Sequence, residues 1–110
     1  MGHLETPIMF GVRRALTESG RWRGWRNNVG KTTDTHVAYG LGKGSPDLVG
    51  VLVGSGRLAC FEVKAVGGRV DKHQAAWHRA ARDAGAFVAV VRSGEEALAA
   101  LERALSGACE

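Results

Sequence analysis

Cysteine is scarce in this sequence, and no long apolar run is present. The 110 residues include two cysteines. Cys60 lies in an expected buried strand and Cys109 in an expected frayed tail, which is not the pattern of a disulfide framework or a CxxC metal knuckle. No apolar stretch approaches the roughly 20 residues that cross a bilayer, and residues 1–7 show no charged segment followed by an apolar one. We therefore expect a cytoplasmic protein in a reducing compartment, with no membrane association.

The charge of the chain favours basic residues. Lys and Arg number 15 against 11 Asp and Glu, and the sequence pI is about 9.6. This balance suits an anionic partner without identifying it. A chain of this length fits one domain over residues 1–110, with room for a modest core, and it contains no internal repeat.

The first half of the chain gives one clear structural signal and two weak ones. Thr6 and Pro7 form a typical helix start, a capping hydroxyl before a residue with preset φ, and apolar residues then recur at helical spacing until about Gly20. Residues 22–29 are rich in Trp and Arg and predict a short strand. Residues 30–45 are polar, glycine-rich and without periodicity, so we expect a mobile loop there.

Two apolar, β-rich runs in the second half predict an antiparallel hairpin. They span residues 47–53 and 58–64 and flank a turn that contains glycine. A further core strand is expected at residues 86–92, after an intervening helix over residues 71–84. A strand, helix, strand succession implies a right-handed crossover, so the sheet should contain both parallel and antiparallel pairs.

Two capping-box patterns mark the starts of the last two helices. Asp71 is followed three residues later by Gln74, and Ser93 is followed by Glu96 in the same way. The first of these helices should end at Gly85. The whole chain then predicts an α/β fold with a mixed sheet flanked by helices, in the order α-β-β-β-α-β-α.

A carboxylate and an amine share one face of the strand at residues 58–64. Side chains alternate along a strand, so Glu62 and Lys64 point to the same side. Asp47 starts the partner strand, where the hairpin can bring it beside Glu62. An exposed Glu-x-Lys pair is common on a solvated sheet face, and Asp is an ordinary turn residue. Their combination in an otherwise apolar hairpin instead favours a site for a hard divalent cation such as Mg²⁺.

These residues resemble a known signature. Ser45 to Asp47, a hairpin and then Glu62 to Lys64 resemble the PD-(D/E)xK nuclease motif. The sequence motifs at residues 25–30, 44–50 and 61–65, followed by Gln74, are similar to those of the virus-type replication-repair nuclease (VRR-NUC) family. The similarity covers nearly the whole chain. The resemblance implies a restriction-endonuclease-like fold and a stand-alone nuclease of a bacterium or phage-infected cell, which hydrolyses DNA with Mg²⁺ or Mn²⁺.

The resemblance also assigns roles to individual residues. Asp47 and Glu62 would bind the metal together with the backbone carbonyl of Val63, and Lys64 would orient or activate the attacking water. Gln74 would help to position the site, in addition to or instead of capping its helix. Glu5, near the start of the first helix, would complete the metal shell, unless it only compensates the helix dipole.

Contacts to the substrate are expected from donors around the acidic centre. Arg26, Asn27 and Asn28 suit phosphate or sugar groups, although they also fit a polar strand end. Lys31 and Lys43 in the expected loop would extend this DNA-binding surface.

DNA structure, rather than DNA sequence, is the expected substrate feature. No sequence-reading element is visible, and stand-alone family members resemble Holliday-junction resolvases, which pair two active sites. This predicts a homodimer acting on branched or junction DNA. Trp22, Trp25 and Trp77 offer apolar rings either for its interface or for the core.

Three other functions have partial support in the sequence. A nucleotide-binding loop ending at Gly30 needs a glycine where the chain has Trp25, and His73 and His78 are five residues apart rather than in an HExxH zinc motif. A non-catalytic DNA-binding module with a nuclease-like fold is the remaining alternative. The intact set of acidic and basic motif residues argues against it.

Overall fold

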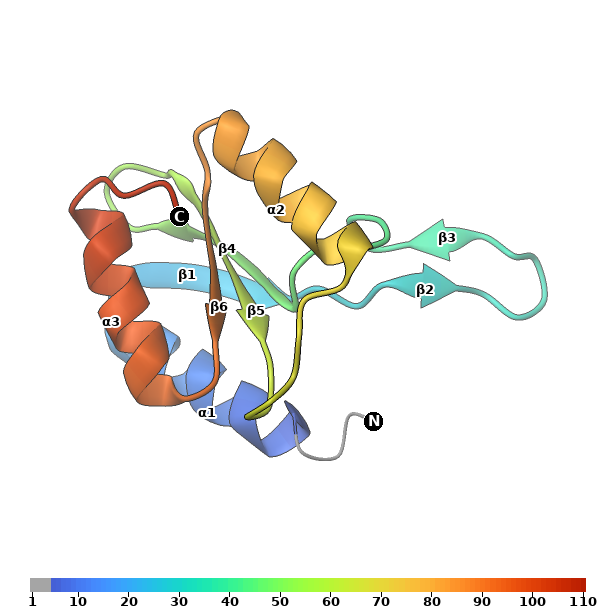
Figure 1. Ribbon diagram of the computed structural model, residues 1–110, viewed down its shortest axis with the longest axis horizontal. Coiled ribbons are helices and arrows are strands. Elements are labelled where there is room, and N and C mark those ends of the chain that lie inside the picture. The colour runs from blue at the N-terminus through green and yellow to red at the C-terminus, as the bar shows by residue number, and fades with distance from the viewer. Residues whose placement is uncertain (1–4) are drawn as a thin grey trace.

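A computed structural model describes residues 5–110, except for the side chain of Glu5 (Figure 1). This part of the chain forms three helices, a four-stranded sheet and a separate two-stranded hairpin. In chain order the elements are α1 (Glu5–Glu18), β1 (Trp22–Arg26), β2 (Gly30–Lys31), β3 (Ala38–Tyr39), β4 (Leu48–Leu52), β5 (Leu58–Val63), α2 (Lys72–Asp83), β6 (Phe87–Val91) and α3 (Gly94–Leu105). None of these helices is long and apolar enough to cross a membrane.

The main sheet is mixed, as the crossover predicted. Its strand order is β1-β4-β5-β6, with antiparallel pairing of β1 with β4 and of β4 with β5, and parallel pairing of β5 with β6. Figure 1 shows α1 and α3 on one side of the sheet and α2 on the other. Phe61 and Val63 of β5 point into the core formed with α1 and α3. Glu62 lies between them in sequence and therefore faces α2.

Trp22 belongs to the core, which is one of the two roles that the sequence left open for its ring. It is 2% exposed, and its indole N–H donates to the carbonyl of Ala59 at 2.9 Å. The ring reaches Ala59 from β1 by crossing β4, where a Cβ on Gly50 would lie 2.5 Å from Trp22 Cε2. Glycine at position 50 therefore makes the space that the indole fills. Trp25, in contrast, is 60% exposed.

Residues 30–45 are not the irregular loop that the sequence predicted. They contain β2 and β3, which pair antiparallel with Gly30 opposite Tyr39, and this hairpin projects from the body of the molecule (Figure 1). The Tyr39 ring covers Gly30, where a Cβ would lie 2.5 Å from the tyrosine hydroxyl. Residues 5–110 therefore contain two more strands than the predicted order α-β-β-β-α-β-α. Strand β1 also ends at Arg26, before the predicted Val29.

The N-termini of the helices agree only in part with the capping patterns predicted from the sequence. The capping box of α2 is complete, with Gln74 N–H donating to Asp71 Oδ1 at 2.8 Å and Asp71 N–H donating to Gln74 Oε1 at 3.0 Å. Ser93 caps α3 as predicted. Glu96, however, accepts the N–H of Arg92 instead of completing a box with Ser93. Helix α1 starts at Glu5, so Pro7 lies inside its first turn, where proline is tolerated.

The end of the chain is attached to the sheet, so the prediction of a frayed tail was wrong. Val88 N–H on β6 donates to the carbonyl of Glu110 at 2.7 Å. The Arg57 guanidinium donates to the carbonyls of Ala104 and Ala108 at 3.2 and 2.6 Å. Cys109 lies within this segment, and both cysteines are free thiols, as expected.

Candidate active site

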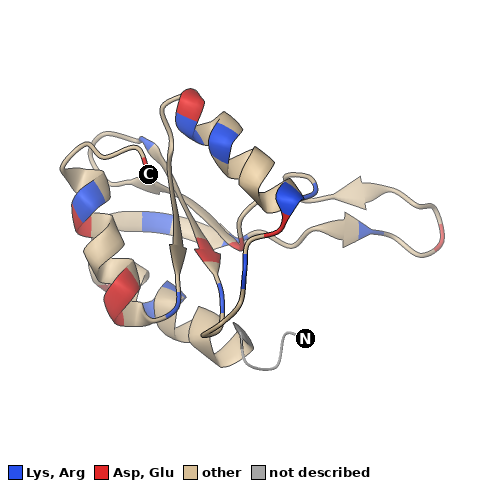
Figure 2. Ribbon diagram, viewed as in Figure 1, with Lys and Arg blue, Asp and Glu red and all other residues tan. Residues whose placement is uncertain are grey.

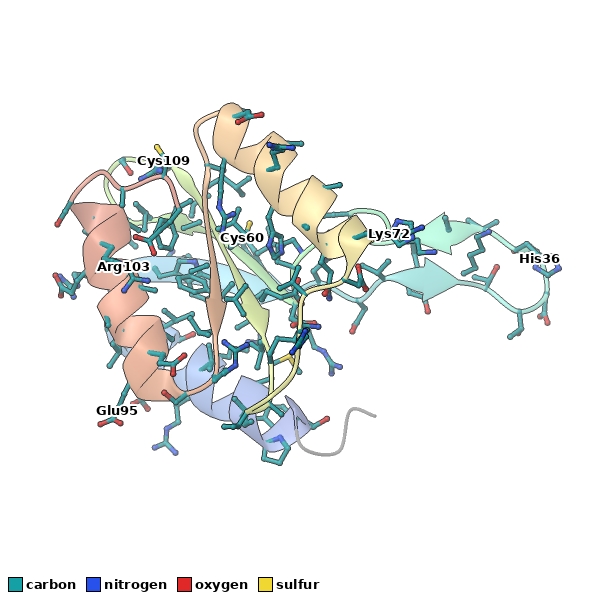
Figure 3. All side chains as sticks on the ribbon, viewed as in Figure 1. His36, Cys60, Lys72, Glu95, Arg103 and Cys109 are labelled. Carbon is teal, nitrogen blue, oxygen red and sulfur yellow. The ribbon has the colours of Figure 1, made fainter. Side chains whose placement is uncertain are left out.

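A polar pocket of about 300 Å³ lies at the edge of the sheet between the start of α2 and the base of the β2–β3 hairpin. Figure 2 shows acidic and basic segments meeting where β5 passes into the segment before α2. Lys72 at the start of α2 lies beside the base of the hairpin, whereas His36 is at its far tip (Figure 3). The pocket lining includes several residues with predicted site roles, namely Asp47, Glu62, Gln74, Arg26, Asn27, Asn28 and Lys43.

Asp47 is held at the start of β4 by bonds from both neighbouring strands. Its Oδ2 atom accepts the N–H of Val63 at 2.8 Å, and its backbone carbonyl accepts the N–H of Asn27 at 2.7 Å. The predicted hairpin does bring Asp47 and Glu62 into one pocket. The bond to Val63 fixes one carboxylate oxygen of Asp47 and therefore its orientation.

Pro46 interrupts the hydrogen-bond ladder between β4 and β5 next to Val63. Continuing the β4–β5 register from the pair of Leu48 and Phe61 places Pro46 opposite Val63. Proline has no N–H, so it cannot donate to the carbonyl of Val63. The ladder of hydrogen bonds between β4 and β5 therefore stops at Pro46 and Val63. The carbonyl of Val63 is left for a partner other than β4.

The side chain of Asn27 holds the turn that carries Asp47. Its amide nitrogen donates to Ser45 Oγ at 2.7 Å and to the carbonyl of Pro46 at 2.9 Å. Its oxygen accepts the N–H of Leu41 at 3.2 Å. The amide group, predicted to contact DNA, is thus used within the protein to connect β1, the turn and the base of the hairpin.

Glu62 is buried between the sheet and α2, where it meets His78. Glu62 is 1% exposed and His78 is 2% exposed, and Glu62 Oε1 lies 3.2 Å from His78 Nε2. Burial lowers the pKa of His78, and the nearby charges of Arg82 and Lys64 lower it further. With its proton on Nε2, the imidazole donates a hydrogen bond to the Glu62 carboxylate.

Sequence reasoning considered His78 only as a zinc ligand and missed this contact. The available signal was its spacing, because His78 follows Gln74 by four residues and so lies on the same face of α2. A polar residue on the face of a helix that packs on a sheet requires a partner there.

Lys64 directly follows β5, and its backbone continues the pairing of β5 with β6. Its backbone N–H donates to the carbonyl of Val91 at 3.1 Å, so its side chain leaves the strand on the same side as that of Glu62. Its charge contributes to the lowered pKa of His78. It also contributes to the lowered pKa of Asp71, whose largest cause is the hydrogen bond from Gln74 N–H. The ammonium group therefore lies near the start of α2.

Gln74 combines a structural contact with a place at the pocket. Its side-chain oxygen is used in the capping box with Asp71. Its amide nitrogen makes no hydrogen bond within residues 5–110, and the residue lines the pocket. The capping box thus leaves the side-chain amide nitrogen of Gln74 available as a donor at the pocket.

Three described residues with predicted site roles, Lys31, Val63 and Lys64, are not among the lining of this pocket. Lys31 lies on β2 and lines a smaller, mostly apolar pocket of about 240 Å³ with Tyr39, and Lys64 is outside the lining. The side chain of Glu5 lies outside the described part of the structure. Among the described side chains, no group of three or more His, Cys, Asp or Glu could hold a metal ion.

Two comparisons with known proteins found matches for this chain. The model of the VRR-NUC domain matches residues 25–95, a range that contains Asp47, Glu62, Lys64 and Gln74. A solved structure described as a VRR-NUC domain is 23% identical and has a TM-score of 0.64, covering 90% of this chain and 95% of that one. No curated protein matches. Since the family model spans more than half of the sequence, this chain belongs to the VRR-NUC family of nuclease domains.

Proposed function

We propose that this domain is a Mg²⁺- or Mn²⁺-dependent endonuclease that hydrolyses phosphodiester bonds in DNA, on a restriction-endonuclease-like fold. The observation that carries the proposal is the placement of Asp47 and Glu62 in one polar pocket, each with one carboxylate oxygen held by a hydrogen bond. Two oriented carboxylates in one pocket are the minimum for a cation site of this kind.

The donor set fits a hard cation. Asp47, Glu62 and the carbonyl of Val63 offer only oxygen atoms, and Pro46 leaves that carbonyl without a ladder partner. Glu5 is proposed as a further oxygen ligand. A bound Mg²⁺ or Mn²⁺ would supply Lewis acidity toward the phosphate and lower the pKa of a bound water.

The remaining residues would hold the substrate and stabilise its charge. Lys64 would place a positive charge where negative charge develops on the phosphate, and the Gln74 amide would orient the water or the phosphate. Contacts to the DNA backbone are proposed for Arg26, Asn28, Lys31 and Lys43, on a chain of net charge +4. Asn27 would act mainly through the turn that it holds.

The proposed substrate is branched DNA, such as a four-way junction, cut by a homodimer with two active sites. Exposed apolar surface supports a second copy as the partner. Trp25 is 60% exposed on β1, and the neighbouring face of the sheet includes Leu58, which is 37% exposed. Light scattering should then give twice the chain mass of 11.7 kDa.

The test is a cleavage assay on a panel of labelled flaps, forks, four-way junctions and linear duplexes. We expect cleavage with Mg²⁺ or Mn²⁺, none with EDTA, and a preference for one branched form. Tight binding of the same panel without any cleavage, under every metal condition, would instead support a DNA-binding module with a nuclease-like fold.

A further inference from the structure

We propose that His78 is a positioning residue that holds the carboxylate of Glu62 in its metal-binding orientation. The inference rests on the proposed function, because Glu62 is a metal ligand only in that account. Its basis is the hydrogen bond between two almost fully buried side chains, His78 Nε2 and Glu62 Oε1, at 3.2 Å.

A buried carboxylate needs such a partner. The side chain of Glu62 is 2% exposed and lies between a strand and a helix, where an unpaired carboxylate would be strongly destabilising. A lysine or arginine in the position of His78 would satisfy Glu62 but would neutralise its charge. An imidazole N–H satisfies the carboxylate with a hydrogen bond and fixes its orientation.

The geometry of α2 fixes where His78 can point. At its start the helix is capped by Asp71 and Gln74. Near its end, the Arg82 guanidinium donates to the carbonyl of Val88 on β6, at 3.2 Å from Nε and 2.6 Å from Nη2. His78 lies between these two attachments and is buried against the sheet.

The base of the hairpin adds a third restraint on α2. Gly44 approaches the first turn so closely that a Cβ there would lie 2.3 Å from the carbonyl of His73. The segment before Asp47 and the helix that carries His78 are therefore packed against each other. Each carboxylate of the proposed metal site is thus oriented by a hydrogen bond, Asp47 by the N–H of Val63 and Glu62 by His78.

Two amide substitutions of different length test this role. His78→Gln places an amide nitrogen near the original position of Nε2, whereas His78→Asn carries the same group on a side chain one methylene shorter. His78→Phe removes the donor and keeps an aromatic ring. We expect Mn²⁺ affinity, measured by calorimetry, to fall about 10–100-fold in the Asn and Phe variants and to stay within about threefold of wild type in the Gln variant.

Controls separate this role from folding and from the proposed function. His36→Asn, at the tip of the hairpin, should bind Mn²⁺ as wild type does, and circular dichroism should show each His78 variant folded. Wild-type affinity in the Asn variant, or equal loss in the Gln and Asn variants, would overturn the role of His78 alone. A wild-type protein without Mn²⁺ binding would overturn both this inference and the proposed function.

A metal-free readout addresses the hydrogen bond itself. Nitrogen-15 NMR should show a proton on His78 Nε2, and Glu62→Gln should shift the resonance of this nitrogen. A proton on Nδ1 alone would contradict donation to Glu62 and overturn the inference.

Discussion

The side-chain amide of Asn27 donates a hydrogen bond to the backbone carbonyl of Pro46 at 2.9 Å. This bond joins the end of β1 to the turn that carries Asp47. The same side chain also contacts Ser45 and Leu41, so one residue fixes both the turn and the base of the hairpin. The proposed active site therefore depends on a residue that need not touch the substrate.

Replacement of Asn27 should weaken both the fold and the site. Asn27→Ala removes three hydrogen bonds, which we expect to lower the free energy of unfolding by about 1–3 kcal/mol. Urea denaturation measures this change, and Mn²⁺ affinity should fall with it. Asn28→Ala is the matched control, because Asn28 is exposed and should change stability by less than about 0.5 kcal/mol. Equal stability of the two variants would contradict the role of Asn27.

Lys64 should affect the rate of cleavage and not the binding of metal. In Lys64→Ala we expect single-turnover cleavage to fall about 100–1,000-fold, because the positive charge acts where charge develops in the transition state. Calorimetric Mn²⁺ affinity should stay close to that of wild type. A parallel loss of affinity and activity would show that the assigned role is wrong.

Gly50 should be required for the packing of Trp22. In Gly50→Ala the new methyl would meet the indole and the carbonyl of Arg23, each at 2.5 Å, so we expect a loss of about 1–3 kcal/mol in urea denaturation. Gly11→Ala is the control, since no atom lies within 4 Å of a Cβ there. Because Gly11 lies within helix α1, Gly11→Ala should raise the free energy of unfolding by about 0.5–1 kcal/mol. A Gly50→Ala variant as stable as wild type would rule out this packing.

Long elements with repeated patterns could be predicted from the sequence. The apolar runs of β4 and β5 and the capping box at Asp71 and Gln74 are local signals that the structure retains. The predicted hairpin also indicated that Asp47 could lie beside Glu62, and both residues line one pocket. These features depend on residues close in sequence.

Features that depend on distant contacts could not be predicted. Strands β2 and β3 have two residues each, too few for a period of two to be recognised, and Tyr39 packs on Gly30 across their pairing. The burial of Trp22 depends on space left by Gly50 on another strand. The role of His78 depends on where α2 crosses the sheet, which its sequence does not specify.

The two cysteines should differ sharply in reactivity. Burial raises the pKa of the Cys60 thiol from 9.0 to about 11, so its reactive thiolate should stay rare at pH 7–9, while Cys109 is exposed. Mass spectrometry after iodoacetamide treatment of the native protein should show one adduct, and two after denaturation. Cys109→Ser should show none in the native state. Fast native modification of that variant would mean that Cys60 is accessible.

The raised pKa of the Cys60 thiol predicts that the protein loses stability in alkaline solution. The folded state holds the Cys60 proton more tightly than the unfolded state does. The contribution of this thiol to the free energy of unfolding is therefore present below pH 9 and is lost as the pH rises toward about 11. Cys60→Ala should remove this part of the pH dependence in urea denaturation. An unchanged profile in the variant would assign the alkaline loss to other groups.

The central claim is most directly tested by cleavage of a labelled four-way junction with Mn²⁺, comparing wild type with Asp47→Asn purified in the same way. The substitution removes a proposed metal ligand and nearly preserves the shape of the side chain, and binding of the junction in EDTA controls for folding. We predict metal-dependent cleavage by wild type and none by the variant, with binding retained by both. Equal cleavage by the two proteins would contradict the claim that Asp47 is part of a catalytic metal centre.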